Sequence, residues 1–531
     1  MKKTVLLILC ILCLLTSLPG CDSSYQEEMS FTCLLPQNID TLDPQIAARS
    51  SSYLVISSLF QGLCRIDAKG NVKPGAARKW SSNENHTEFT FHLYTDSLWS
   101  NGEPVTANDF LFAIQRALRP ETATPSVDDL FIIQGARAIY NGEADESQLG
   151  VWVKDDYTLI VQLEKSYPDF PALTAGTHYM PCNQAFFEAC AGHYGLSSEY
   201  LITNGPFTFP TIYAWNTDYG TRKVELEPSD SYRKRQDVAP ASLTFLIDYD
   251  DAYLSDPVSA LVNGQNDIAT LTETAAKEAN RRGCGIQVLD DAITGLLLNP
   301  EADELKSPQT REVFIKTLDR QELLNRRMDK NSAEAMGIMA DCVRWGGEYY
   351  YADGVAMFAQ QDDAVMTEVL PELLKSLKEK NLPSITVICP DDEESINIAN
   401  GLLICWNSKL GNAYNIQPLP DAEFQERIAA GEYQAAIYTL RAGGTIPYQT
   451  LKAFESTSTP ALLKSPEYDT MLHSLSFDLS SYRELESYLQ NQYLFYPLFS
   501  DKSYYVSSPN SKGILASPDL TIDFSGAKKK E

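Results

Sequence analysis

The chain opens with a short apolar segment that follows two lysines. Lys2 and Lys3 precede an uninterrupted apolar run from Val5 to Leu15, and a small-residue stretch then leads into Cys21. The run is shorter than the roughly 20 residues that cross a bilayer, so it predicts a cleaved secretion signal over residues 1–20. The cysteine that follows predicts a lipoprotein, with acyl chains attached to Cys21 and a polar tether up to residue 29.

Further along, the pattern of apolar and polar positions predicts two strands and a helix. Apolar residues alternate with polar ones over residues 88–94 and again over residues 158–163, which is typical of half-buried strands. Between them, Thr106 and Asp109 have the spacing of a capping box and predict the start of a helix. The apolar stripe of this helix ends before Pro120, where a helix is expected to stop.

Composition narrows the class of protein. The 531 residues are 44% hydrophobic and 10% aromatic, which is ample for folded cores and excludes disorder. A chain of this length exceeds what one core usually organises, so we expect two or three lobes. The net charge of −28 argues against nucleic acid as a partner, because binding it requires Lys and Arg to neutralise phosphates.

Cysteine and histidine offer one possible metal site. His178, Cys182, Cys190 and His193 are residue types that zinc prefers, but natural Cys2His2 sites usually place their cysteines two to four residues apart. We therefore favour buried cysteines and surface histidines, with no metal and no cofactor. The scattered spacing of the other cysteines does not define a disulfide framework. Neither a Gly-x-Ser-x-Gly nor a His-Glu-x-x-His motif occurs, and we expect no enzyme activity.

Several longer segments together resemble one known family. They occur in order along the mature chain: Leu42-Asp43-Pro44, Leu59-Phe60-Gln61-Gly62-Leu63, Phe89-x-Phe91-x-Leu93, Trp99-Ser100-Asn101-Gly102-x-Pro104-Val105-Thr106-Ala107-x-Asp109-Phe110, Asn204-Gly205-Pro206-Phe207, the segment from Leu261 to Ala269, and Ser307-Pro308-x-Thr310-Arg311 through Leu318-Asp319-Arg320. In these segments the chain resembles the oligopeptide- and dipeptide-binding proteins of bacterial ABC importers, the extracellular solute-binding protein family 5. The block around Trp99 is the longest and most specific.

The resemblance implies an α/β, two-lobed periplasmic-binding-protein-like fold of type II, with an extra subdomain in lobe 1 that closes on ligand like a hinged trap. The implied divisions are lobe 1 (30–70, 195–295 and 500–524), an inserted subdomain (71–194), lobe 2 (296–499) and a frayed tail (525–531). Crossings between the lobes are expected near residues 296–299 and 496–501. The implied partners are a peptide or small-molecule ligand, permease subunits and the membrane through the lipid, with the protein itself a monomer.

The ligand-binding residues that the resemblance implies depart from the family pattern. Peptide-binding members carry a loop, typically Gly-Trp-x-x-Asp-Tyr-x-x-Pro, whose aspartate pairs with the free amine of the peptide. Here that loop aligns with residues 439–447, so Leu440 replaces the Trp and Gly443 replaces the Asp. A buried ammonium without a carboxylate is costly, which makes a free N-terminus a doubtful ligand unless another acid reaches it.

Other residues of the same region are candidates for ligand contacts. Arg441 offers a planar fork for a carboxylate or phosphate, although a solvent-facing arginine on a loop is an equal alternative. Tyr438, Arg441 and Gly443 are expected to line the site, together with Asn38 and Ile39, which match a ligand-lining loop.

Two functions from different classes are left open. The favoured one is an extracytoplasmic binding lipoprotein that delivers peptides or related solutes to an ABC importer. The alternatives are a ligand-sensing lipoprotein with no dedicated permease, and a carrier of a non-peptide anionic solute or metal chelate.

Overall fold

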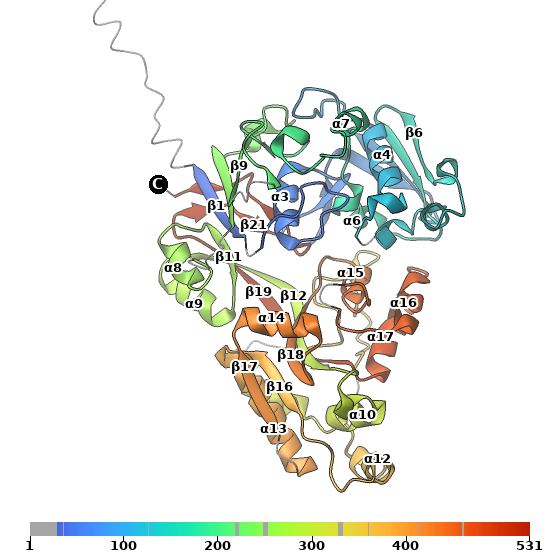
Figure 1. Ribbon diagram of the computed structural model, residues 1–531, viewed down its shortest axis with the longest axis vertical. Helices are drawn as coiled ribbons and strands as arrows, with labels where there is room; N and C mark the ends of the chain where they lie inside the picture. The colour runs from blue at the N-terminus through green and yellow to red at the C-terminus, as the bar shows by residue number, and fades with distance from the viewer. Residues whose placement is uncertain are drawn as a thin grey trace, which may run out of the picture.

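The computed structural model describes residues 29–35, 37–125, 127–217, 222–247, 253–327, 333–358, 361–411, 414–458 and 461–530. It shows an α/β protein with two lobes, joined by two long strands at its centre (Figure 1). The expected signal peptide and Cys21 lie outside the described residues. Within the described ranges, no helix combines the length and apolar character that a membrane span requires.

Lobe 1 is built on a mixed sheet that contains the N-terminal strand. In the described part of the chain this sheet has the order β1-β10-β9-β8, and β1 and β10 run in parallel. Alternate residues of β10 are buried, which places one face of the sheet against the core. The strands are β1 (Ser30–Leu35), β8 (Phe207–Thr208), β9 (Lys223–Pro228) and β10 (Ser242–Ile247).

A second antiparallel sheet of lobe 1, with the order β4-β5-β7-β6, confirms the predicted strands and helix. The helix α4 (Ala107–Ala117) begins where the capping box placed it, because the backbone N–H of Thr106 donates to the Asp109 carboxylate at 2.7 Å. Its apolar stripe packs against the sheet. The strands are β4 (Ala77–Ser82), β5 (Glu88–Leu93), β6 (Val151–Asp155) and β7 (Thr158–Gln162).

A buried ion pair fastens this helix to the first loop of lobe 1. The Arg116 guanidinium binds the Asp43 carboxylate through two contacts of 2.5 and 2.6 Å, and both side chains are almost fully buried. Burial opposes the charge on Arg116, but Asp43 outweighs it and holds the pKa of the guanidinium above its usual range. The Leu42-Asp43-Pro44 motif is therefore structural, because removing either partner would leave an unpaired buried charge.

Two other motif segments meet each other in lobe 1. The Asn204 side chain accepts from the backbone N–H of Gln61 and donates to its carbonyl, both at 3.0 Å. Next to it, the backbone N–H of Gly205 donates to the Leu59 carbonyl at 2.8 Å. A Cβ on Gly205 would lie 2.6 Å from the backbone of Leu59, so glycine is required for this close approach.

A buried carboxylate ties the last strand to the first. Asp267 is 2% exposed, accepts from the backbone N–H of Thr32 at 2.9 Å and binds the Lys529 ammonium at 2.5 Å. Lys529 belongs to the short strand β23 (Lys528–Lys529). The structure therefore differs from the expected frayed tail, since the chain stays ordered to residue 530 and its lysine neutralises a buried acid.

Two long antiparallel strands join the lobes. β12 (Gly285–Leu298) and β19 (Phe495–Ser507) pair along most of their length, and the register places Leu296 opposite Tyr496. Their register shifts between Leu289 and Ala292, which marks an irregularity near the middle of β12. Both strands pass from one lobe to the other in Figure 1, so they form the connection about which the lobes can move.

Lobe 2 extends the same sheet with parallel strands covered by helices. In the described residues, β18 pairs with β12, β16 pairs with β18 and β17 forms the edge. Trp406 and Phe314 are fully buried and stack edge to face in the core of this lobe. The elements are β16 (Thr386–Pro390), β17 (Asn415–Leu419), β18 (Ala435–Arg441), α10 (Pro308–Lys316), α11 (Arg320–Arg326), α12 (Val369–Leu377), α13 (Glu393–Leu410) and α14 (Asp421–Ala430).

Short elements fill the remaining connections. They are α3 (Ser50–Leu59), α5 (Ala136–Tyr140), α6 (Phe170–Leu173), α7 (Gln184–Ala189), α8 (Pro257–Val262), α9 (Glu273–Arg281), β2 (Cys64–Ile66), β3 (Val72–Pro74), β11 (Ile268–Leu271), β13 (Ala333–Glu334), β14 (Arg344–Trp345), β15 (Glu348–Tyr349), β20 (Ser511–Lys512), β21 (Leu515–Ala516) and β22 (Ile522–Asp523). The eight cysteines in the described part of the chain are unpaired.

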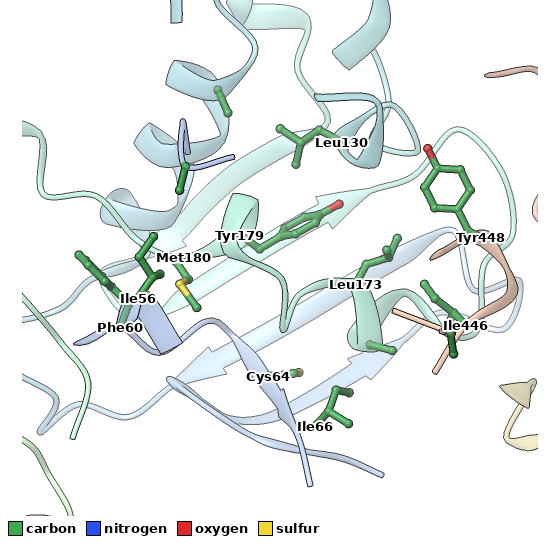
Figure 2. Close-up of a cluster of buried hydrophobic side chains, with 14 of the residues drawn as sticks. Ile56, Phe60, Cys64, Ile66, Leu130, Leu173, Tyr179, Met180, Ile446 and Tyr448 are labelled. Carbon is green, nitrogen blue, oxygen red and sulfur yellow. The ribbon is translucent and has the colours of Figure 1, made fainter. Parts of the chain in front are cut away.

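The last helices of lobe 2 pack against lobe 1. They are α15 (Pro447–Lys452), α16 (Pro466–His473) and α17 (Leu479–Asn491). Figure 2 shows Ile446 and Tyr448, on the lobe 2 segment, beside Leu173 and Leu130 of lobe 1. All four belong to one continuous cluster of buried side chains, so the hydrophobic core crosses the boundary between the lobes here.

One buried acid on α17 organises a neighbouring loop. The Glu486 carboxylate is fully buried, accepts from the backbone N–H of Ile338 at 3.0 Å, and also accepts from the Tyr351 hydroxyl. Burial disfavours the charged form and raises the pKa of Glu486 to about 7, although these hydrogen bonds act in the opposite direction.

We expect Glu486→Gln to change the pH dependence of stability. Because the folded pKa lies above the unfolded value, the contribution of Glu486 to stability is fully present below the unfolded pKa and is lost as the pH rises through about 7. The amide of the variant stays neutral at every pH. The free energy of unfolding of Glu486→Gln should therefore rise relative to that of wild type between pH 5 and 8, by at most roughly 3 kcal/mol. Urea unfolding across this range measures the effect. The exposed Glu484→Gln on the same helix is the control, and parallel curves for wild type and Glu486→Gln would contradict the assignment.

Candidate ligand-binding cleft

A cavity of about 1390 Å³ lies between the two lobes. It exceeds the roughly 300–1,000 Å³ that suits a drug-sized ligand, so it has room for a larger solute. Both lobes and the connecting strands contribute to its wall, and the residues with polar or aromatic side chains that matter most below are Tyr53, Asp128, Asp129, Thr294, Arg327, Asp392, Glu394, Tyr438, Arg441, Lys452, Glu455, His473, Asp501 and Lys502.

Three of the five ligand-binding residues expected from sequence lie in this wall: Tyr438, Arg441 and Gly443. Their setting differs from the expected loop, because β18 continues to Arg441 through its pairing with Ala292 of β12. The hydrogen-bonded ladder therefore fixes the backbone of Arg441, and its exposed side chain projects from the end of a strand rather than from a loop.

Arg441 acts on two buried groups in its neighbourhood. Burial raises the pKa of Asp291, which is 1% exposed, and the nearby Arg441 guanidinium opposes that rise. Burial likewise raises the pKa of Tyr505, and Arg441 again acts in the opposite direction. The Arg441 charge thus also acts on groups of the connecting strands.

At Gly443 the wall of the cavity is open. The residue has a φ of +66°, and a Cβ built on it would meet no other atom within 4 Å. The left-handed backbone favours glycine here. Where peptide-binding relatives place an aspartate, this chain therefore has no side chain, and any carboxylate for a ligand amine must come from elsewhere in the cavity.

Asn38 and Ile39 are not brought to this cavity. Ile39 is 8% exposed and packs in the core of lobe 1, whereas Asn38 is exposed and its carbonyl accepts from Arg49 at 3.4 Å. Instead, Ala48 and Tyr53, which follow a few residues later, contribute to the wall. A role of Asn38 and Ile39 as ligand contacts stays a prediction, and this arrangement does not support it.

At one end of the cavity, a lysine of lobe 2 lies between two acids of lobe 1. The Lys452 ammonium is 3.0 Å from the Asp128 carboxylate and 2.8 Å from that of Asp129. Burial opposes the charge on Lys452, but the two carboxylates outweigh it and raise the pKa of the ammonium above its usual value. Burial would likewise raise the pKa of Asp129, yet Lys452 and His178 hold it well below its usual range.

An imidazole and another acid extend this cluster. His473 Nε2 lies 2.6 Å from the Glu455 carboxylate, and this hydrogen bond raises the pKa of the histidine. Ligand-type atoms of Asp128, Glu455 and His473 lie within 4.8 Å of one another. Their contacts with Lys452 and with each other already satisfy the charges, so the cluster is explained as an ion-pair network.

The opposite wall holds a buried arginine between acids. Arg327 is 3% exposed, binds Glu394 at 2.6 Å and Asp501 at 3.2 Å, and lies over the Phe499 ring. The Asp501 carboxylate also accepts from the Thr294 hydroxyl at 2.6 Å. One guanidinium faces two carboxylates, so this group keeps a net negative charge while it holds polar atoms of lobe 2 and the connecting strands at the cavity surface.

The His/Cys group considered as a metal site is not assembled. His178 contacts Asp129 at 3.3 Å. Cys182 is buried next to the Arg116–Asp43 pair, and burial raises the pKa of its thiol. Cys190 closes α7, and the ring of His193 lies beside Tyr200. Each of the four residues therefore has its own structural contacts. In the described part of the chain, no three of them bring their ligand atoms close together.

Acidic residues predominate in the cavity wall. Among the described residues that line it, eight are Asp or Glu and four are Lys or Arg. Field lines are focused in a cleft with low-dielectric walls, so this excess repels anions and attracts cationic groups. The charge of the wall therefore disfavours the alternative of a non-peptide anionic solute.

The sequence offered no signal for the network around Lys452. Asp128 and Lys452 are 324 residues apart in the chain, so spacing could not connect them. Lys452 does follow the family loop closely, only five residues after Pro447. A search for cations just beyond that loop could have identified Lys452, but not its partners.

Comparison with known proteins places the chain in a family. The model for bacterial extracellular solute-binding proteins, family 5, matches residues 71–461. A dipeptide-binding protein of Lactococcus lactis is 26% identical over 308 residues, or 58% of this chain and 55% of that protein, so this match spans about half of the relative. The oligopeptide-binding protein OppA of Bacillus subtilis is 23% identical over 90% of this chain and 88% of its own.

Solved structures agree with the fold. The Haemophilus influenzae OppA complex with the peptide RPPGFSPFR superimposes with a TM-score of 0.71 at 21% identity, covering 95% of this chain and 99% of that one. At this identity the likeness concerns the two-lobed fold and not the ligand. The match of the family model to residues 71–461, which is most of the chain, shows that this chain belongs to the bacterial extracellular solute-binding proteins, family 5.

Proposed function

We propose that the protein is an extracytoplasmic substrate-binding lipoprotein that captures peptides or related small solutes between its lobes and delivers them to the permease of an ABC importer. The observation that carries this proposal is the cavity of about 1390 Å³, whose wall is shared by both lobes and by β12 and β19. A ligand that touches both walls binds the closed form better than the open one, so it shifts the population toward the closed form.

The charge of the wall supports a ligand with a cationic group, such as a peptide with a free amine. The acid that relatives place in the loop is missing at Gly443, but eight acidic side chains line the same cavity. One of these can meet the amine from another direction. Arg441 is the proposed partner for the anionic end of the same ligand, with Tyr438 beside it.

The remaining parts of the proposal concern location and organisation. Cys21 carries the lipid and holds the protein at the outer face of the membrane, and the chain acts as a monomer without enzyme activity. The inserted subdomain corresponds to residues 71–194 and lobe 2 to residues 296–499. This division is supported by the second sheet of lobe 1, which lies within the first range, and by the lobe 2 strands, which lie within the second.

Free-amine peptides should raise thermal stability more than the same peptides after N-acetylation. Binding at 100 times the dissociation constant adds about 2.7 kcal/mol to the free energy of unfolding. Loss of a charge-assisted contact should weaken the acetylated peptide by roughly tenfold or more. A thermal-shift comparison of paired peptide pools, with organic acids as a third set, measures this. Stabilisation by organic acids but by neither peptide pool would refute the proposed ligand class.

Arg441→Met should weaken binding of peptides with a free C-terminal carboxylate by about tenfold to a hundredfold, because a hydrogen bond to a charged group is lost. Binding of C-terminally amidated peptides should change little. Titration calorimetry compares the two, and Arg281→Met, on an exposed arginine of α9 outside the cavity, is the control. Equal losses for both peptide forms would remove Arg441 from the proposed contact.

A further inference from the structure

A short segment of lobe 2 is seated in lobe 1. We call Ile446, Tyr448 and Lys452, at the start and end of α15, the interlobe anchor. Ile446 and Tyr448 are 1% and 3% exposed, and Figure 2 shows them beside lobe 1 side chains such as Leu173 and Leu130. Because these apolar groups belong to a buried cluster that continues into lobe 1, separating the lobes would expose apolar surface to water.

Polar contacts fix the position of the anchor. The Tyr448 hydroxyl donates to the Asp128 carboxylate, and the Lys452 ammonium lies within 3.0 Å of both Asp128 and Asp129. The side chains of Lys452 and Asp128 are only 15% and 11% exposed. A pair this well shielded is screened weakly by salt, and the two neighbouring acids would repel each other without the lysine.

Further contacts continue the same boundary. Tyr167 of lobe 1 is fully buried against Trp345 and Phe477 of lobe 2, with ring centroids 6.2 and 5.1 Å apart. The backbone N–H of Gly346 also donates to the Asp169 carboxylate of lobe 1 at 2.8 Å. All these contacts are made by the protein itself and leave the cavity open beside them.

We propose that the interlobe anchor holds the lobes closed in the ligand-free protein, with Lys452 as the residue that determines the balance between closed and open forms. Because most molecules are then closed before ligand binds, little of the binding free energy is needed to shift the population further toward the closed form. This inference does not depend on which solute is bound or on delivery to a permease.

The position of the anchor also couples it to the ligand site. The segment 442–446 runs directly from the end of β18 in the cavity wall to α15. The backbone N–H of Arg344, in the β14 hairpin, donates to the Thr445 carbonyl at 2.8 Å, and the N–H of Ala442 donates to the Asp291 carbonyl at 2.8 Å. A ligand that moves this segment would therefore move the anchor with it.

Small-angle X-ray scattering of the ligand-free protein tests the proposal. The protein is unfolded in urea, dialysed and refolded so that any carried solute is removed. We expect the wild type to have the radius of gyration of the structure described above, in which the interlobe anchor contacts lobe 1. Lys452→Met should lower the ratio of closed to open forms by at least tenfold, seen as a larger radius of gyration. The attraction across the lobe boundary is lost, and Asp128 and Asp129 are left shielded without their cation until the lobes open and water reaches them.

Two further variants separate closure from folding. Lys409→Met removes a lysine that pairs with Asp363 within lobe 2 and should leave the scattering unchanged. Adding Asp128→Asn and Asp129→Asn to Lys452→Met removes the unpaired carboxylates that closure would shield from water, and it should restore closure in part because Ile446 and Tyr448 remain. Circular dichroism verifies that each variant is folded. A wild type that is open without ligand, or a Lys452→Met variant that is as compact as wild type, would overturn the proposal.

Discussion

The pairing of β12 with β19 is the constraint on which the rest of the structure depends. These strands are the shared connection between the lobes, and their register sets how the two halves face each other. β18 is added to β12, which brings Tyr438 and Arg441 to the cavity wall, and Asp501 and Lys502 reach the wall from β19. A single ladder of backbone hydrogen bonds thus positions both the connection between the lobes and part of the cavity wall, because the pairing fixes the backbone from which these side chains project.

Local signals in the sequence predicted local structure well. Alternation over residues 88–94 and the spacing of Thr106 and Asp109 depend on neighbours in the chain, and the structure contains the corresponding strand and capped helix. The family motifs anticipated the fold because residues such as Asp43 and Asn204 hold lobe 1 together through buried contacts. The ordered C-terminus was missed because the partner of Lys529 lies 262 residues earlier, at Asp267.

The cavity was predictable only where a motif marked it. Tyr438, Arg441 and Gly443 were found by aligning one loop, but the same alignment could not tell that β18 extends to Arg441. Asp128 and Glu455 are brought to the cavity by tertiary packing, and such packing produces no local pattern of residues that could be recognised in the sequence. The acidic character of the wall therefore emerges only when distant segments are assembled, and it argues against the alternative of an anionic solute.

The clasp of Asp267 with Thr32 and Lys529 has a mechanical consequence. It gathers the first and last described strands at one place on lobe 1, so a pull applied upstream of Ser30 would be borne by that lobe. Lobe 2 has no such attachment within the described residues beyond the two connecting strands and its seat on lobe 1. In a protein tethered through its N-terminus, lobe 1 would stay fixed relative to the membrane. The motion of lobe 2 would then be the change that a membrane protein beside it could detect.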